Sequence, residues 1–307
     1  MRIFITGGSG WIGSGVIREL VAAGHSVTAL VRTDAAAAKV KAAGAEPRMG
    51  DITDLPTLST AIESVDGVIH LAFDHRFTTS DLLGAIAVRL THLPSLARIS
   101  RAARTDLRAI ETMIAGLAGK SLVVTSPIAG LRQRVVGTED DRLITSSFGA
   151  IRIASERIAI AAKHVRTASI RLPPTVHGAG DTGFVKTLVD LARSTGRSVY
   201  RGSNHWPAVH RDDAAELYRF AIEGLAGGSI PAGTVLHGVA EQGVAFEDIA
   251  RAIGKRTGVP VEFGKVPGFV GMVTALDLQA TAYRTRAKTG WIPSRPGLLD
   301  DIASVYG

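Results

Sequence analysis

Residues 1–16, MRIFITGGSGWIGSGV, decide the fold of this chain. The segment Ile3–Thr6 is apolar and rich in β-favouring residues, which predicts a buried strand. Five glycines follow between Gly7 and Gly15, and from Trp11 onward the apolar residues recur at helical spacing. A strand that enters a helix through a glycine-rich turn is typical of the first unit of a doubly wound α/β sheet.

The glycines of this turn fit two spacings of one motif. Gly8, Gly10 and Gly13 match G-x-G-x-x-G, and Gly7 with Gly10 and Gly13 matches a variant. Glycine lets the backbone approach a pyrophosphate closely, and the helix N-terminus offers free N–H groups and a positive dipole end. The alternative is a glycine-rich turn without a ligand. We expect a dinucleotide here, held by Thr6, Gly7, Gly10, Trp11, Ile12 and Gly13.

Strand and helix patterns alternate over the first half of the chain. Strands are expected at 3–6, 27–31, 45–49, 67–71, 122–125 and 167–172, and helices at 11–23, 35–43, 55–62, 93–118 and 148–163. Short, continuous apolar strands separated by helices predict a parallel sheet that is covered on both faces. The fold class is therefore α/β, with a Rossmann-type doubly wound parallel sheet.

The rhythm changes after Leu172, where Pro173 and Pro174 interrupt the pattern. Beyond them, helices are expected at 184–196, 212–224 and 246–258, and strands at 234–239 and 261–266. We predict a dinucleotide-binding domain at residues 1–172. Residues 173–307 are predicted to form a smaller substrate-binding lobe that is interleaved with the sheet.

Composition excludes several classes of protein. The 307 residues are 46% hydrophobic and 21% charged, as in ordinary globular proteins. The absence of cysteine excludes disulfides, thiolate catalysis and cysteine-based zinc sites. We find neither a signal peptide nor an apolar run of the roughly 18 residues that a membrane span needs. We expect a cytoplasmic protein that does not bind membranes.

The net charge of +7 raises the question of a polyanion partner. Most basic residues are dispersed, and the main cluster is Arg98, Arg101, Arg104 and Arg108, on one face of a predicted helix. Asp106 is near enough in sequence to offset part of that charge. Because aromatic residues are few, we interpret this face as solvated and expect no nucleic acid. No metal site is expected either.

Arg32 stands at the end of the second predicted strand, roughly 20 residues beyond the glycine turn, where NAD-binding sites place an acid. Arginine pairs with a 2′-phosphate, whereas a carboxylate would repel it. The position therefore favours NADP over NAD. The alternative is that Arg32 is a surface residue and that Asp34 serves the ribose.

Further motifs resemble the extended short-chain dehydrogenases/reductases, a group that includes the NAD-dependent epimerase/dehydratases. The matching segments are Gly50–Ile52, Val68–Ala72, Val123–Ser126, Ile170–Pro173, Val176–Gly178, Pro207–Asp213 and Arg286–Pro293. Together with the Thr6–Gly13 turn, these matches run from the first strand to the last helix. The resemblance implies that Asp51 and Ile52 flank adenine, that Leu71, Ala72 and Pro173 line the cofactor, and that Ser126 orients a substrate.

One segment departs from that group, whose members typically carry Tyr-x-x-x-Lys on the helix after the Ser strand. Residues 146–156 read SSFGAIRIASE, so that Phe148 takes the Tyr position and Arg152 the Lys position. Phenylalanine has no proton to give, and arginine is effectively always charged. The usual acid of the group is therefore missing from this window.

Three interpretations follow from the missing acid. An activated acceptor, such as an iminium, would need little acid. Alternatively another group replaces the tyrosine, with Ser126, Asp74, His75, His177 and His210 as candidates. In the third, the chain binds NADP without turnover, as a sensor or scaffold. An epimerase or lyase with no net cofactor consumption is a further class.

We expect an NADPH-dependent oxidoreductase that reduces a small organic carbonyl, enone or iminium compound. The catalytic candidates are Ser126, His75 and Arg152, where Arg152 would reach a cofactor ribose or a substrate anion. The helix predicted at 148–163 is apolar nearly all round, and this suggests a homodimer as a candidate assembly.

Overall fold

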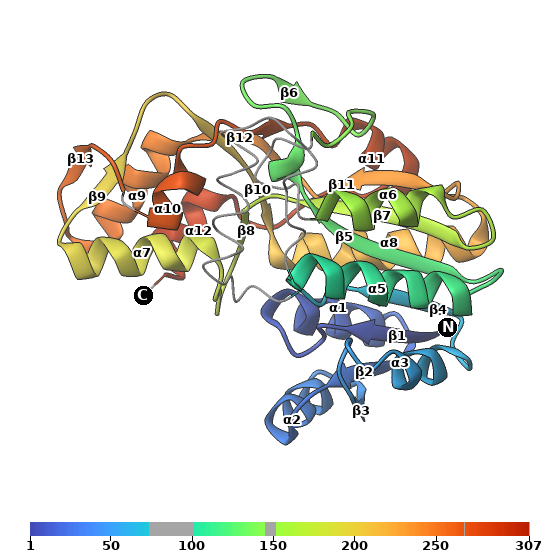
Figure 1. Cartoon of the computed structure of the whole chain (residues 1–307). Coiled ribbons are helices and arrows are strands. Elements are labelled where there is room, and N and C mark those ends of the chain that lie inside the picture. Colours follow the sequence, from blue (N-terminus) through green and yellow to red (C-terminus); the bar gives the residue numbers. More distant parts are fainter. Residues whose placement is uncertain (74–100, 145–151, 267, 307) are drawn as a thin grey trace.

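A computed structural model describes residues 1–73, 101–144, 152–266 and 268–306 of the chain (Figure 1). At its centre is a seven-stranded sheet in the order β11-β7-β5-β4-β1-β2-β3, and all neighbouring strands in it are parallel. The prediction of a Rossmann-type doubly wound parallel sheet is confirmed. Chain order reverses between β1 and β4, where such sheets bind their ligands.

The strands of this sheet are short and, apart from β3 at one edge, largely buried. They are β1 (Arg2–Thr6), β2 (Ser26–Val31), β3 (Glu46–Met49), β4 (Gly67–His70), β5 (Ser121–Pro127), β7 (Arg166–Leu172) and β11 (Thr234–His237). The first six lie within two residues of the predicted strands. Strand β11 comes from the C-terminal half and pairs with β7, so both halves of the chain build the sheet. A domain division at residue 172 stays a prediction.

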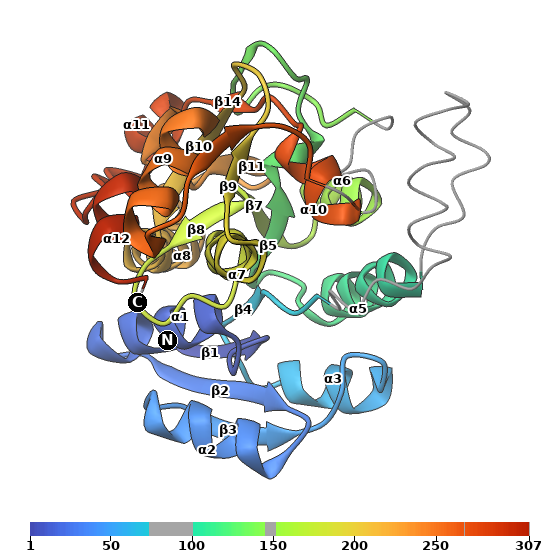
Figure 2. The same ribbon diagram turned by 90° about the vertical axis from the view of Figure 1, so that its left-hand side faces the viewer.

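Helices cover both faces of the sheet, and β1 shows why. Ile3 and Ile5 pack into the core formed with α1 (Trp11–Ala22) and α8 (Arg211–Gly227). Phe4, between them, points to the opposite core. Strand side chains alternate between the two faces, so a continuous apolar strand needs cover on both. Figure 2 shows α1 and α3 on opposite sides of β1 and β2.

The remaining helices of these layers follow the predictions closely. Helix α2 (Asp34–Ala42) belongs to the layer of α1 and is capped by the Thr33 hydroxyl. The opposite layer holds α3 (Leu55–Ile62), α5 (Arg101–Gly116) and α6 (Ile153–Ala161). The predicted helices at 93–118 and 148–163 begin outside the described residues.

Part of the C-terminal half forms a second core around Trp206 and Phe246, whereas Ala280, Ala282 and Trp291 pack into the core of α1 and α8. Its small sheets join β12-β10-β8, β13-β9 and β14-β6. Their bounds are β6 (Val136–Gly137), β8 (Thr175–His177), β9 (Ser198–Tyr200), β10 (His205–His210), β12 (Glu241–Ala245), β13 (Val261–Phe263) and β14 (Gln279–Ala280).

The other described helices are α7 (Phe184–Thr195), α9 (Phe246–Thr257), α10 (Gly268–Thr274), α11 (Tyr283–Thr289) and α12 (Leu298–Ser304), and η2 (Ile128–Gly130) is a single turn after β5. The predicted helices at 184–196 and 246–258 agree with α7 and α9. Within the part of the chain that the structure describes, no helix has the length and apolar character that a membrane crossing requires.

Candidate active site

The glycine turn after β1 is packed so tightly that two of its positions exclude a side chain. Gly7 has φ +76°, and a Cβ there would lie 2.7 Å from the backbone nitrogen of Ala72. A Cβ on Gly13 would lie 2.2 Å from the carbonyl oxygen of Gly7. These two glycines let α1 and the residues after β4 close onto the turn.

Gly10 is exposed, and a Cβ there would lie 3.1 Å from the carbonyl oxygen of Gly7. It is the N-cap of α1, and no side chain caps the helix there. The N–H groups of the first helical residues, Trp11, Ile12 and Gly13, have no partner within the helix. The start of α1 thus presents open donors and the positive end of the helix dipole.

Thr6 links this turn to the end of β4. Its carbonyl accepts from the Leu71 N–H at 3.1 Å, and its Oγ1 accepts from the Ala72 N–H at 3.3 Å. The residues predicted to line a cofactor beside β4 therefore lie directly against the glycine turn. Pro173 is buried one residue beyond the end of β7, on the same edge of the sheet.

Arg32 lies one residue beyond β2 and is 66% exposed. Its Nη1 is 3.7 Å from Oδ2 of Asp51, a side chain that is 36% exposed. Ile52, beside Asp51, packs against the core under α3. Asp34, the alternative ribose ligand, is exposed in the first turn of α2.

Polar side chains replace the apolar ones where the central strands end. Val68 on β4 and Val124 on β5 pack toward α3, α5 and α6. Two residues further along each strand, His70 and Ser126 therefore face the same layer. Thr6 faces it as well, since its hydroxyl lies 2.7 Å from His70 Nδ1. All three are buried.

Asp106 of α5 and Arg152, the residue before α6, complete the cluster of Thr6, His70 and Ser126. Asp106 of α5 is 1% exposed, and its Oδ1 lies 3.2 Å from both His70 Nε2 and Arg152 Nη2. Arg152 precedes α6, and its guanidinium lies 4.5 Å from the centre of the Phe73 ring. A continuous chain of contacts thus joins the glycine turn at Thr6 to Arg152.

The hydrogen-bond directions in this chain are mutually compatible. The Ala72 N–H donates to Thr6 Oγ1, and the Thr6 hydroxyl can donate to Nδ1 of His70. His70 Nε2–H then donates to Asp106. In this assignment His70 carries its proton on Nε2, and Arg152 is the cation that balances the negative charge of Asp106.

Electrostatics keep Asp106 ionised although it is buried. Burial by itself would raise the pKa of Asp106, but the Arg152 charge and the His70 hydrogen bond lower it to about 2. The carboxylate and the guanidinium therefore form a buried ion pair. The sequence predicts that Asp106 offsets part of the charge of the arginine cluster, and the structure shows that its carboxylate contacts His70 and Arg152. Arg104 and Arg108 of that cluster are exposed.

Two buried polar atoms near the ends of these strands, Arg152 Nε and Ser126 Oγ, have no hydrogen-bond partner among the described residues. Buried polar atoms are normally paired with protein or with ordered water, so this region is a place for water or a ligand group. His75, Asp74 and Phe148 lie outside the described residues.

The other two histidine candidates lie elsewhere. His177 ends β8 and His210 ends β10, and both face Asp301 of α12, at 2.6 Å and 3.7 Å. The pKa of His210 is lowered, because burial outweighs the attraction of Asp301. Among the described residues, no group of His, Asp and Glu side chains is arranged to hold a metal ion.

Tyr218 is the tyrosine that approaches the ends of the central strands. It extends from α8 to the hydroxyl of Thr125 on β5, at 2.7 Å, from the opposite face of the sheet. Burial raises the pKa of its hydroxyl. Tyr218 is fully buried, and this position indicates a packing role.

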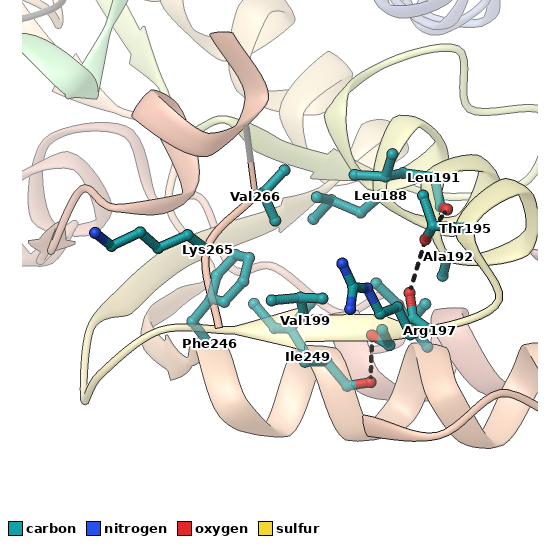
Figure 3. Close-up of a pocket in the computed structure, with 13 residues that line it drawn as sticks. Leu188, Leu191, Ala192, Thr195, Arg197, Val199, Phe246, Ile249, Lys265 and Val266 are labelled. Carbon is teal, nitrogen blue, oxygen red and sulfur yellow. Dashed lines mark hydrogen bonds between the residues drawn. The ribbon is translucent and has the colours of Figure 1, made fainter. Parts of the chain in front are cut away.

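A separate pocket of about 140 Å³ opens in the second core (Figure 3). Its walls are apolar side chains of α7 and α9 together with Val199 of β9 and Val266. Arg197 and Lys265 border it, and Arg197 is paired with Glu262 at 3.1 Å. The lining shares no residue with the Thr6–Arg152 cluster.

Known proteins share both sequence and architecture with this chain. The pattern of the NAD dependent epimerase/dehydratase family matches residues 3–233. An uncharacterized protein of Schizosaccharomyces pombe is 37% identical over 319 aligned positions, which cover 99% of each chain. The 4-hydroxy-2-methyl-3-oxo-4-farnesyl-3,4-dihydroquinoline-1-oxide ketoreductase of Stigmatella aurantiaca is 30% identical over 239 positions, which cover 75% of this chain and 67% of that protein.

A solved structure agrees with the fold. A double mutant of the dTDP-glucose 4,6-dehydratase DesIV from Streptomyces venezuelae, with NAD bound, matches with a TM-score of 0.75. The match covers 100% of this chain and 96% of that chain at 20% identity, and it carries the fold alone. The resemblance inferred from the sequence motifs is confirmed by the family match.

Proposed function

The chain belongs to the NAD dependent epimerase/dehydratase family, and we propose that it is an oxidoreductase that uses NADPH to reduce a small organic carbonyl, enone or iminium compound. One observation carries the proposal. The open N-terminus of α1 follows β1, at the place where the strand order reverses between β1 and β4. The cation Arg32 lies just beyond β2, the strand on the other side of β1. Open amides suit a pyrophosphate, and an exposed guanidinium suits a 2′-phosphate.

The residues present fit a dinucleotide of this kind. The N–H groups of Trp11, Ile12 and Gly13 would hold the pyrophosphate, since Gly10 leaves them uncovered. Asp51 and Ile52 would flank the adenine, and Arg32 would pair with the 2′-phosphate. At the other end, Leu71, Ala72 and Pro173 would line the nicotinamide half. When bound, the cofactor supplies a hydride.

Reduction of a carbonyl places negative charge on the substrate oxygen. Ser126 is suited to orient that oxygen, because its buried hydroxyl near the end of β5 has no hydrogen-bond partner within residues 1–73, 101–144, 152–266 and 268–306. Arg152 would stabilise the developing charge by its field and would not transfer a proton. The proton donor stays a prediction, and the sequence offers Asp74, His75, His177 and His210 as candidates.

The name of the Stigmatella relative supports the carbonyl class, because that protein is a ketoreductase. The family also contains epimerases and dehydratases, in which the cofactor is not consumed overall. An epimerase or lyase, and an NADP sensor without turnover, are therefore the competing functions. Net loss of NADPH on addition of a carbonyl compound separates the reductase from both.

The first test is calorimetric titration of the purified protein with NADPH and, separately, with NADH. We expect NADPH to bind and Arg32→Ala to weaken it by about 10- to 100-fold, because a charge-assisted pair is lost. Panels of carbonyl, enone and iminium acceptors then follow, with NADPH consumption as the readout. If neither dinucleotide binds to folded protein, the proposed function is wrong.

A further inference from the structure

The loop at residues 178–183, between β8 and α7, contacts the first residue of α1. The indole Nε1–H of Trp11 donates to the carbonyl oxygen of Ala179 at 3.2 Å, although the two residues are 168 positions apart. The guanidinium of Arg211 lies 5.3 Å from the centre of the Trp11 ring. Two segments of the C-terminal half therefore hold the side chain of a residue whose backbone N–H is a proposed pyrophosphate donor.

A buried carboxylate, that of Asp181, fixes this loop to the start of α7. Its Oδ1 accepts from the N–H of Gly183, the N-cap of that helix, at 2.5 Å. Its Oδ2 accepts from the N–H of Lys186, in the first turn, at 3.2 Å. Carboxylates are suited to this place, because the first N–H groups of a helix have no partner within it.

The hydroxyl of Tyr306 bonds to this loop on both sides of Ala179. Tyr306 lies two residues beyond α12 and is buried in the second core, and its hydroxyl donates to Asp181 Oδ2 at 2.7 Å. The hydroxyl oxygen accepts from the N–H of Gly178 at 3.4 Å. Burial and the neighbouring Asp181 raise the pKa of this hydroxyl, so it keeps its proton and remains a donor. Ala179 is itself exposed, so its place depends on how its neighbours are held.

We propose that Tyr306 is a positioning residue for the cofactor site, which acts on Trp11 through the loop at 178–183. The proposal rests on the proposed function, in which the backbone N–H of Trp11 binds the pyrophosphate. Tyr306 and Asp181 keep the Ala179 carbonyl where it accepts the indole N–H. A tethered indole restricts the first residue of α1 to one orientation, so less freedom is lost when the cofactor binds.

Tyr306→Phe removes one hydroxyl and keeps the ring in the second core. Loss of a single hydrogen bond of this kind changes an equilibrium constant by about two- to tenfold, so we expect NADPH binding to weaken by a factor in this range. Trp11→Phe removes the indole N–H at the other end of the same series of contacts and should have an effect of similar size. Because both changes break one series of contacts, the double variant should bind NADPH within about twofold of the weaker single variant.

Calorimetric titration with NADPH of the wild type, Tyr306→Phe, Trp11→Phe and the double variant tests this directly. Tyr283→Phe is the matched control, because it removes the hydroxyl of an exposed tyrosine and should leave the affinity unchanged. Thermal unfolding without nucleotide establishes that each variant is folded. A merely structural role of Tyr306 would lower the unfolding temperature and leave the NADPH affinity of the folded protein as it is.

The proposal is supported if Tyr306→Phe weakens NADPH binding by more than about twofold and the effects of the two single variants do not multiply in the double variant. It is overturned if folded Tyr306→Phe binds NADPH within about twofold of the wild type, or if the two effects multiply. If Tyr306→Phe does not fold, Asp181→Asn takes its place with the same criteria, because it removes the carboxylate that the hydroxyl contacts. Absence of NADPH binding by the wild type would instead refute the proposed function, and the positioning role with it.

Discussion

Replacing Asp106 with Asn should destabilise the protein strongly, because it leaves the buried Arg152 without a counter-charge. The pair is buried, with Asp106 1% exposed and the Arg152 side chain 10% exposed. Breaking such a pair by removing one partner typically costs about 3–5 kcal/mol. The exposed pair Lys186–Asp190, at 2.6 Å, is the matched control, and Asp190→Asn should cost less than about 0.5 kcal/mol.

The Asp106 carboxylate should also make the free energy of unfolding of the wild type sensitive to acid. The pKa of Asp106 is lowered from 3.8 to about 2 in the folded state. A lowered pKa stabilises the fold above the unfolded value, and this stabilisation is lost as pH falls through the folded value. The contribution amounts to about 2 kcal/mol and should disappear between roughly pH 4 and pH 2. Asp106→Asn should lack this step, so the difference in stability between the two proteins should shrink as pH falls.

Urea unfolding, followed by the fluorescence of the buried Trp206 and Trp291, measures these differences. The double variant Asp106→Asn/Arg152→Met should recover much of the loss, because both charges are then absent. If Asp106→Asn alone does not fold, recovery of folding in the double variant tests the same buried ion pair. A loss below about 1 kcal/mol for Asp106→Asn, with no pH dependence in the difference, would refute a buried ion pair at this position.

Two further predictions concern the glycine turn and the missing acid. Gly13→Ala should reduce NADPH affinity at least about tenfold, because its Cβ would overlap the Gly7 carbonyl. Gly15→Ala is the control and should bind NADPH normally in the same titration, because its Cβ would meet only the flexible Arg211 side chain, at 3.4 Å. Phe148→Tyr combined with Arg152→Lys should increase carbonyl reduction strongly, as measured by NADPH consumption. No gain, in a folded variant that binds NADPH, would contradict the alignment of residues 146–156 with Tyr-x-x-x-Lys.

Local patterns were sufficient for the parallel sheet and the turn. The helix at Leu55–Ile62 is found with its predicted bounds, because Asp54 caps it and Pro56 fits its first turn. Strands β8, β10 and β12 could not be predicted in the same way. Strand β10 reads HWPAVH, and short segments with His and Pro carry little period-2 signal. Their pairing is decided by the packing of distant segments.

The contacts that define the candidate site are also long-range. Asp106 and Arg152 are 46 residues apart and meet because α5 and α6 pack over the same end of the sheet. In the sequence, Asp106 is surrounded by arginines, which suggested a surface role. What distinguishes it is the burial pattern of α5, in which Asp106 shares the apolar face with Ala109, Ile110 and Met113. A lone acid on an apolar helix face was the available signal.

The two Asp–Arg pairs of this site contain the same chemical groups, but they differ in exposure to solvent and therefore in what they can do. Asp106 and Arg152 are buried, so their charges are committed to each other and to His70, and they can fix geometry but cannot exchange partners at low cost. Arg32 and Asp51 are exposed, so water screens their attraction and either can turn to a ligand. A fixed pair belongs where Arg152 must keep one orientation. A solvent-exposed pair suits a position where a ligand is expected to bind, since a phosphate can displace a weak contact.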